Sequence, residues 1–209
     1  MSILVSELRE IGQFFRRNSR EMVVICAATL FLILQRYHPV GPRYASQFFY
    51  FAVLPLLTIV IVLRKNPLDF GLRPGNFRIW GVHVGVTIVI AFVLLYSASH
   101  IPSISGYYAK RGFNLLTYTV KISVILLSWE FLFRGFLLFG LKDKLREASI
   151  LVQMVPFALL HIGKPEAETI SCIVTGIYFG YVSYRGNSYW PACIMHLFIN
   201  IAYVLLVNR

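Results

Sequence analysis

A long apolar run from Leu115 to Leu141 carries an acid and a base in its second half, Glu130 and Arg134. Within hydrocarbon, backbone polar groups must be satisfied inside the segment, so a run of this length is expected to be helical. A charged side chain at the centre of such a helix costs at least about 2.5–3.5 kcal/mol. Residues four apart share a helix face, so this pair can partly neutralise itself. The run predicts a membrane helix with an inward polar face, either a functional site or a structural ion pair.

The composition extends this conclusion to the whole chain. Of 209 residues, 57% are hydrophobic and 14% are charged, which excludes an ordinary soluble domain. We expect an all-α, polytopic membrane helix bundle that forms a single domain over residues 1–209. The net charge of +11 sits mainly in short loops, so we expect contact with anionic membrane lipids and no nucleic-acid partner. The cysteines lie in apolar runs, without the spacing of a disulfide framework or a metal site.

The apolar runs predict about seven transmembrane helices, or six if Met22–Leu34 does not span the membrane. We expect spans at 20–37, Phe48–Leu63, Ile79–Tyr96, Leu115–Leu141, Ala148–Ile162, Thr169–Tyr184 and Tyr189–Val207. Pro55 is expected to kink the second of these. Ahead of them, the basic segment Met1–Glu21 has apolar residues at helical spacing, which favours an amphipathic interfacial helix.

The distribution of Lys and Arg predicts a cytoplasmic N-terminus, because cytoplasmic loops carry the excess of positive charge. With seven spans, the N-terminal side would hold Arg9, Arg16, Arg17, Arg20, Arg64, Lys65, Arg73, Arg78, Lys142, Lys144, Arg146 and Arg185. The opposite side would hold Arg36, Arg43, Lys110, Arg111, Lys164 and Arg209. We therefore expect a multi-pass protein of the cytoplasmic (inner) cell membrane.

Three pairs of residues, each spaced four apart and each with at least one polar side chain, fall at membrane depth in the second half of the chain. They are Glu130 with Arg134, Phe157 with His161, and His196 with Asn200. Each pair shares one helical face. A carboxylate and an imidazole can hold and deprotonate a water, a second imidazole and an amide can donate to an oxyanion, and a guanidinium can keep the carboxylate ionised. This set would be sufficient for peptide hydrolysis without a serine or cysteine nucleophile.

Other interpretations fit the same residues. The histidines and Asn200 could serve only as hydrogen bonds between helices. The polar residues could relay protons in a transporter, although we find no internal repeat to favour it. Two histidines and one glutamate could also ligate zinc, but the chain has no His-Glu-x-x-His motif and the ligands would come from different helices. We expect no metal and no cofactor.

The three pairs resemble the motifs of the CPBP family of intramembrane glutamic proteases (CAAX prenyl protease and bacteriocin-processing type, also called Abi). That family carries Glu-Glu-x3-Arg, Phe-x3-His and His-x3-Asn on successive membrane helices. This chain reads Trp129-Glu130-x3-Arg134, Phe157-x3-His161 and His196-x3-Asn200. The resemblance covers about residues 67–207, which would be the catalytic core behind N-terminal helices in residues 1–66. An upstream segment, Asp69-Phe70-Gly71-Leu72-Arg73, is also similar to a loop of many members.

The resemblance implies a metal-independent endopeptidase that cuts a membrane-anchored protein or peptide. Glu130 and His161 would hold the water, His196 and Asn200 the oxyanion, and Arg134 would support the carboxylate. The family's first Glu, usually the water-activating one, is Trp129 here. This variant resembles a branch that includes myxosortase-like sorting proteases, which implies removal of a C-terminal tail. The same substitution leaves open a catalytically inactive scaffold or an immunity-type binding protein on the same fold.

Overall fold

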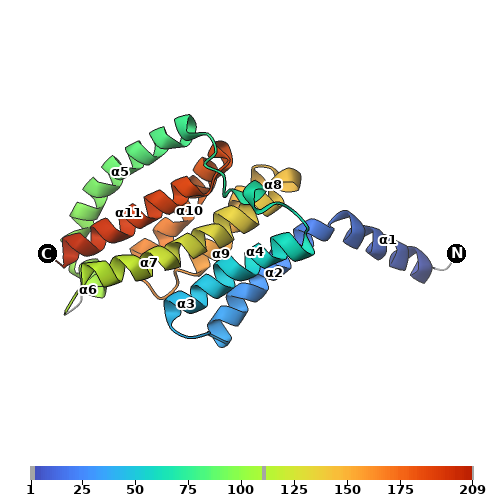
Figure 1. Ribbon diagram of the computed structural model, residues 1–209, viewed down its shortest axis with the longest axis horizontal. Helices are drawn as coiled ribbons and strands as arrows, with labels where there is room; N and C mark the ends of the chain where they lie inside the picture. Colours follow the sequence, from blue (N-terminus) through green and yellow to red (C-terminus); the bar gives the residue numbers. More distant parts are fainter. Residues whose placement is uncertain (1–2, 110–111, 209) are drawn as a thin grey trace.

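The computed structural model describes residues 3–109 and 112–208, which form helices and short turns with no β-strand among them (Figure 1). Lys110, Arg111 and Arg209, which enter the charge count above, lie outside the described residues. The helices in chain order are α1 (Ile3–Arg17), α2 (Ser19–Tyr37), α3 (Arg43–Phe48), η1 (Phe49–Val53), α4 (Leu54–Leu57), η2 (Thr58–Val62), η3 (Pro67–Phe70), α5 (Phe77–Ser99), α6 (Pro102–Tyr108), α7 (Leu115–Glu130), η4 (Phe131–Phe139), α8 (Gly140–Leu145), α9 (Ala148–Leu159), α10 (Glu166–Gly186) and α11 (Trp190–Val207).

Helices occupy all seven stretches in which spans were expected, and the all-α membrane bundle is confirmed. Among the described residues, four helices are long and apolar enough to cross a membrane. They are Arg43–Val62, Phe77–Ser99, Leu115–Leu145 and Trp190–Val207, and the bent pair α1 and α2 could supply a fifth.

The number of spans supported by length and composition is therefore lower than seven. With 12 residues, α9 reaches only about 18 Å, which is short for a hydrocarbon core of about 30 Å. The 21-residue helix α10 is long enough but begins with Glu166 and Glu168 and carries Arg185 in its last turn.

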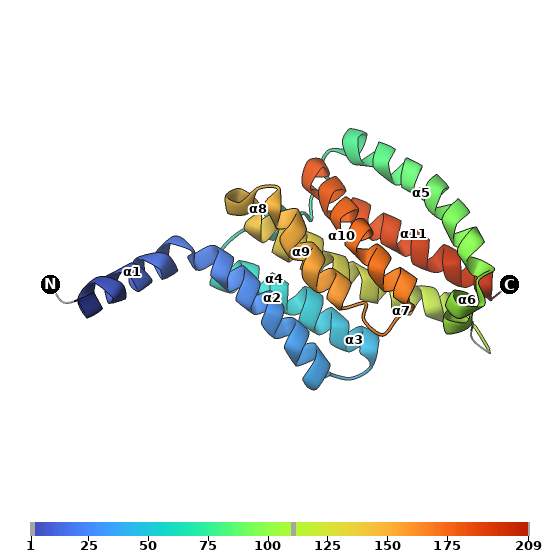
Figure 2. The same cartoon turned by 180° about the vertical axis from the view of Figure 1, so that it is seen from behind.

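The continuous helix Leu115–Leu145, made of α7, η4 and α8, is the centre of the bundle. In the most apolar 18-residue stretch of this helix, 72% of the residues are buried, whereas the share is 17% in the corresponding stretch of α5 at the periphery. The segment η4 contacts α2, which precedes it in the sequence, and α9 and α10, which follow it. Helices from both halves of the chain therefore surround it. Figures 1 and 2 show this central helix running between α2 and α4 on one side and α10 and α11 on the other. The residues with the least access to lipid or water are thus those of η4.

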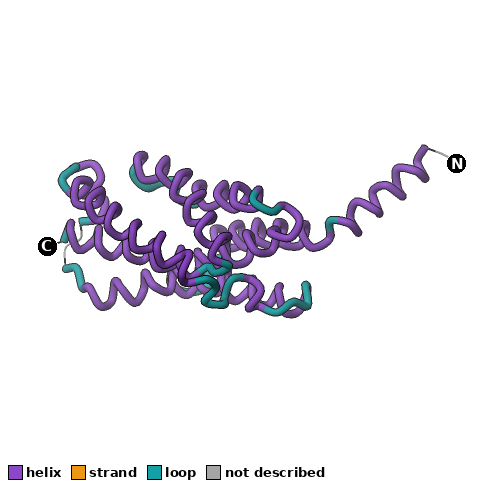
Figure 3. The backbone as a smooth tube through the Cα atoms, turned by 90° about the horizontal axis from the view of Figure 1, so that it is seen from above, coloured by secondary structure: helices purple, strands orange, loops and turns teal. Residues whose placement is uncertain are grey.

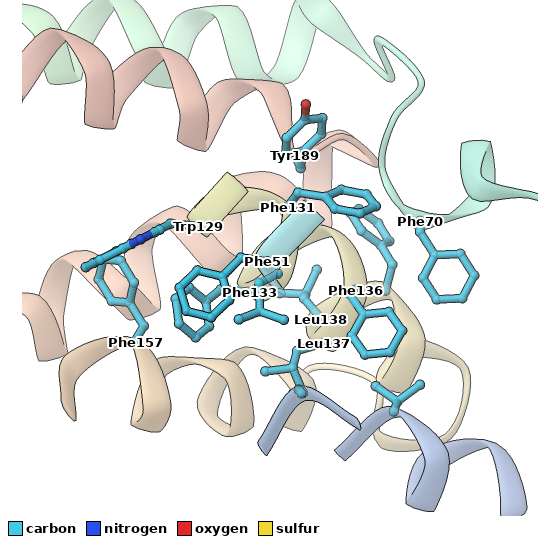
Figure 4. Close-up of a cluster of buried hydrophobic side chains, with 14 of the residues drawn as sticks. Phe51, Phe70, Trp129, Phe131, Phe133, Phe136, Leu137, Leu138, Phe157 and Tyr189 are labelled. Carbon is cyan, nitrogen blue, oxygen red and sulfur yellow. The ribbon is translucent and has the colours of Figure 1, made fainter. Parts of the chain in front are cut away.

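Large side chains from η4 and its neighbours fill the core around this central helix. Phe133, Phe136, Leu132 and Leu138 are fully buried, as is Phe51 from η1. Figure 4 shows these rings converging from several helices on the central one. Burying each such side chain contributes about 1.5–3 kcal/mol in a soluble protein, whereas in lipid close packing takes over much of that role.

Three parts of the Arg43–Val62 and Leu115–Leu145 helices, η1, η2 and η4, are π-helical. A π-helix widens the turn by bonding residue i to i+5, and such segments are frequent at functional sites. Pro55 lies between η1 and η2, where the altered bonding accommodates a residue without a backbone N–H. The nine-residue segment η4 begins directly after Glu130 and contains Arg134.

The periphery is apolar, as expected for a lipid-facing surface. Along α5, Val82, Val89 and Val93 are each more than 60% exposed. The N-terminal helix α1 has no buried residue, is bent by 75° from α2 and extends beyond the bundle (Figure 3). The basic residues of α1 are arginines. Its position at the membrane interface stays a prediction.

Candidate active site

Glu130 and Arg134 form an ion pair in the interior of the bundle. Both side chains have 0% exposure, and Arg134 Nη1 lies 2.9 Å from Glu130 Oε2 and donates to Oε1 at 3.1 Å. The second guanidinium nitrogen donates to the carbonyl of Gly176 on α10 at 3.4 Å. The Arg134 carbon Cζ lies 3.9 Å from the centre of the Phe157 ring, a cation–π contact. The guanidinium thus fixes the carboxylate from behind and offsets its charge.

His196 on α11 contacts the same carboxylate from the other side. Its Nδ1 lies 2.6 Å from Glu130 Oε1. Since an ionised carboxylate can only accept, Nδ1 carries the proton in this hydrogen bond. In the neutral ring the remaining nitrogen, Nε2, then has a free lone pair and can act as a base. The arrangement is that of a carboxylate that orients an imidazole.

His161 follows the end of α9 and is buried, with 2% exposure. Its Nδ1 lies 2.8 Å from the carbonyl oxygen of Phe157, which can only accept, so Nδ1 is again the protonated nitrogen. The centres of the His161 and His196 rings are 6.3 Å apart, and the rings are inclined by 28°. Two imidazoles with a basic Nε2 therefore lie next to each other beside one ionised carboxylate.

Trp129 is the aromatic neighbour of His161 on the central helix. The two ring centres are 5.4 Å apart in an edge-to-face arrangement, and the indole is 3% exposed. The ring of Phe157 also contacts His161, with ring centres 4.7 Å apart, and Figure 4 labels both Trp129 and Phe157. The buried indole nitrogen Nε1 makes no hydrogen bond to any described residue. Trp129 can donate a hydrogen bond here, but it cannot accept a proton as a glutamate would.

Asn200 lies one turn beyond His196 on α11 and is half-buried. Its Oδ1 accepts a hydrogen bond from the hydroxyl of Tyr118, which comes from α7. This bond fixes the orientation of the amide, because it assigns the oxygen and leaves Nδ2 as the donor on the other side. The sequence analysis did not include Tyr118. A tyrosine in an apolar helix needs a partner for its hydroxyl, and this requirement is the signal that could have identified it.

A second polar cluster joins α6 to the turn before α10. The hydroxyl of Tyr108 donates to Glu168 at 2.6 Å, and Lys164 Nζ donates to the same carboxylate at 2.7 Å. Burial, followed by the hydrogen bond to Glu168, raises the pKa of Tyr108 well above its usual range. The phenol therefore stays protonated at neutral pH and holds α6 over this end of the bundle.

The structure thus brings four of the five predicted site residues into direct contact or ring proximity. Glu130, Arg134, His161 and His196 form one cluster, and Asn200 follows on the same helix as His196. Glu130 is hydrogen-bonded to His196, whereas the nearest ring partners of His161 include Trp129. Among the described residues, no three His, Cys, Asp or Glu side chains form a group suited to holding a metal ion.

Comparison with known proteins shows that the part of the chain holding these residues is similar to one protein family. Residues 111–202 match the family model of type II CAAX prenyl endopeptidase Rce1-like proteins, and this range contains all five predicted site residues. Comparisons with curated proteins and with solved structures give no match. The matched segment holds the three motifs in order and folds them into one buried cluster. The match therefore supports a relationship between this chain and the CPBP family, the family of the CAAX prenyl endopeptidases.

Proposed function

We propose that this protein is an intramembrane endopeptidase that hydrolyses a peptide bond in a membrane-associated protein. The family match supports a CAAX-type protease role. The observation that carries the proposal is the 2.6 Å contact between Glu130 and His196 inside the bundle, with His161 beside it. A buried carboxylate that orients an imidazole is a costly arrangement in lipid and serves acid–base chemistry directly.

In the mechanism we propose, His196 is the general base and Glu130 orients it. Glu130 accepts a hydrogen bond from Nδ1–H, so Nε2 can take a proton from a water as that water attacks the substrate carbonyl. The imidazolium that forms is stabilised by the carboxylate and later returns the proton to the departing amine. Arg134 keeps Glu130 ionised throughout. This assignment differs from the one implied by the resemblance, in which Glu130 and His161 hold the water.

His161, Asn200 and Trp129 are proposed to surround the reacting carbonyl. His161 presents a second Nε2 that can accept a hydrogen bond from the attacking water. The amide nitrogen of Asn200 and the unpartnered indole N–H of Trp129 are donors suited to an oxyanion. Under this scheme Trp129 replaces a base of the family pattern with a donor, and the basic role passes to the two histidines.

The substrate class we propose is a C-terminal segment of a membrane-anchored protein, cut close to the bilayer without a metal ion. CAAX-type peptides, with and without a prenyl group, and tail-bearing membrane proteins are the substrates to compare. Activity is expected to survive exhaustive chelation. Loss of cleavage on chelation, with recovery on addition of zinc, would contradict the metal-independent scheme.

The test compares single variants of the pair with a matched histidine outside the site. We expect Glu130→Gln and His196→Asn to lower kcat by about 10²–10⁴-fold, the usual contribution of a general base. His83→Asn is the control, because His83 lies on α5 and contacts the hydroxyl of Tyr178 at 3.2 Å. It should cleave at the normal rate. Normal cleavage by both site variants, purified in folded form, would refute the proposal.

A second candidate function is a catalytically inactive binding protein or scaffold on the same fold. The specific observation in its favour is Trp129, which fills the position of the family's first Glu and packs against His161. The two functions differ in one result. An inactive protein would retain a bound partner protein intact by mass, and Glu130→Gln would change neither the partner's mass nor its amount.

A further inference from the structure

A cavity of about 420 Å³ lies at the end of the bundle where α8 meets the beginning of α2. None of the proposed catalytic residues lines it. Its charged lining consists of four cations and two carboxylates: Arg20, Lys65, Arg73, Lys142, Asp69 and Asp143. Because four cations and two carboxylates line the cavity, the lining has an excess of two positive charges.

The two carboxylates are already matched by the two arginines. Arg20 pairs with Asp143, and Arg73 lies 2.8 Å from Asp69. The excess charge therefore belongs to Lys65 and Lys142. An anion that enters this cavity meets two lysines for which the described residues provide no direct ion pair.

Lys142 is held in place by neutral oxygens, and only the electrostatic influence of the neighbouring Asp143 offsets part of its charge. Its Nζ donates to the carbonyl of Tyr184 at 3.0 Å and to the side chain of Asn187. In the same lining, the Nε of Arg20 is buried and has no hydrogen-bond partner among the described residues. A buried N–H donor without a partner is unfavourable by about 1–3 kcal/mol unless a ligand or water accepts from it.

The loop that forms the floor of the cavity is rigid. It is the segment Asp69–Arg73, a motif that the proposed catalysis does not use. Phe70 is 1% exposed and stacks on Phe136 of η4 with ring centres 6.3 Å apart. Gly71 has a φ of +82°, and its carbonyl accepts from the backbone N–H of Tyr189 at 3.0 Å. The motif therefore shapes a preformed cavity, which favours binding because little order is lost.

The cavity lies beside the ends of two candidate membrane spans. Lys65 follows Val62, the last residue of one candidate span, and Lys142 is in the last turn of the span Leu115–Leu145. Both spans therefore end at the cavity. In a bilayer, this is the level of the phosphate groups, and each Lys or Arg near an anionic surface contributes about 1 kcal/mol of attraction.

We propose that this cavity binds the phosphate of an anionic phospholipid headgroup. Lys65 and Lys142 supply the charge, Arg20 supplies the unused N–H, and the depth selects a lipid over a free anion. The proposal does not depend on the proposed protease activity and would hold equally for an inactive protein.

The experiment measures lipid binding by the purified full chain in a neutral detergent. Dioctanoyl phosphatidylglycerol is the anionic probe and dioctanoyl phosphatidylcholine is the zwitterionic one. We expect a saturable rise in the thermal midpoint, and a one-lipid adduct in native mass spectrometry, with the anionic probe only. Lys65→Glu should weaken this binding by about tenfold or more. Arg185→Glu, which changes the net charge equally at an exposed position outside the cavity, should leave it within about twofold.

Two results would overturn the proposal. Equal weakening by Lys65→Glu and Arg185→Glu would mean diffuse electrostatic attraction without a site. A shift with inorganic phosphate as large as that with phosphatidylglycerol would mean a site for a free anion. Lys65→Gln serves as the milder variant, and unfolding curves recorded without lipid establish that each variant is folded before its binding is compared.

Discussion

At the scale of single residues, the buried ion pair is the feature on which the interior depends. Glu130 and Arg134 are fully buried four residues apart, and the exposed pair Asp69 and Arg73 has the same spacing with both side chains 58% exposed. Burial makes the difference between them. Water screens the exposed pair, whereas removal of one partner of the buried pair leaves a charge without compensation.

The first prediction follows from this contrast. Arg134→Met should lower the free energy of unfolding by about 3–5 kcal/mol, because it leaves the Glu130 carboxylate buried with only His196 as partner. Arg73→Met, the matched control, should change it by about 1 kcal/mol or less. Denaturation of the two variants in the same detergent measures both. Similar losses for the two variants would contradict the account of the pair.

Trp129 provides the second prediction. Trp129→Phe keeps an aromatic ring against His161 and removes the indole N–H. If that N–H contacts the oxyanion, kcat should fall by about 10²–10³-fold with little change in KM. A steady-state comparison with the parent protein measures this split. A change confined to KM would assign Trp129 to substrate packing, and no change would exclude it from the reaction.

At the scale of elements, the π-helical segment η4 determines how closely its neighbours approach. A Cβ on Gly135 would lie 2.6 Å from the Phe131 ring and 3.2 Å from the Phe70 carbonyl. On α5, a Cβ on Gly85 would meet no atom within 4 Å. Both positions are helical, so intrinsic helix propensity favours alanine equally at each.

The third prediction uses this pair of glycines. Gly135→Ala should destabilise the protein by about 1–3 kcal/mol through overpacking, and Gly85→Ala should be neutral or slightly stabilising. Thermal unfolding in detergent distinguishes them. If both variants shift the midpoint in the same direction and to the same extent, η4 is not the tightly packed element described here.

Most of the helix positions could be predicted from the sequence, but fewer of the contacts in the candidate site could. The apolar runs predicted α2, α5, α11 and the continuous helix Leu115–Leu145 within a few residues, because hydrocarbon leaves a long segment no alternative to a helix. The same runs could not show that α9 ends at Leu159 or that η4 is π-helical, since both depend on packing. Spacing of four residues predicted that Glu130 and Arg134 meet. It could not predict that His196, sixty-six residues away, bonds to Glu130, or that Tyr118 orients Asn200.

At the scale of the whole molecule, positive charge gathers at one end of the bundle, which suggests an orientation in the membrane. The N- and C-termini lie at opposite ends of the long axis (Figure 1). Arg20, Lys65, Arg73 and Lys142 gather around the cavity at the end from which α1 extends. Positive charge is retained on the cytoplasmic side of a membrane, so this end is proposed to face the cytoplasm.

The fourth prediction concerns this orientation. Reporter fusions should place the N-terminus in the cytoplasm and the C-terminus on the opposite side, as expected if the bent pair α1 and α2 supplies the fifth span. Single cysteines introduced at either end, in a background without Cys26, Cys172 and Cys193, provide an independent reading through membrane-impermeant labelling. Termini on the same side would contradict an odd number of passes, and an N-terminus outside the cytoplasm would contradict the charge argument.

The measurement that tests the central claim most directly is a double-mutant cycle on Glu130 and His196, with cleavage of a tail-bearing membrane protein followed by mass. If the two residues act as one catalytic unit, Glu130→Gln, His196→Asn and the double variant should be slowed to about the same extent. Multiplicative losses in the double variant, or cleavage by it at the parent rate, would contradict the account.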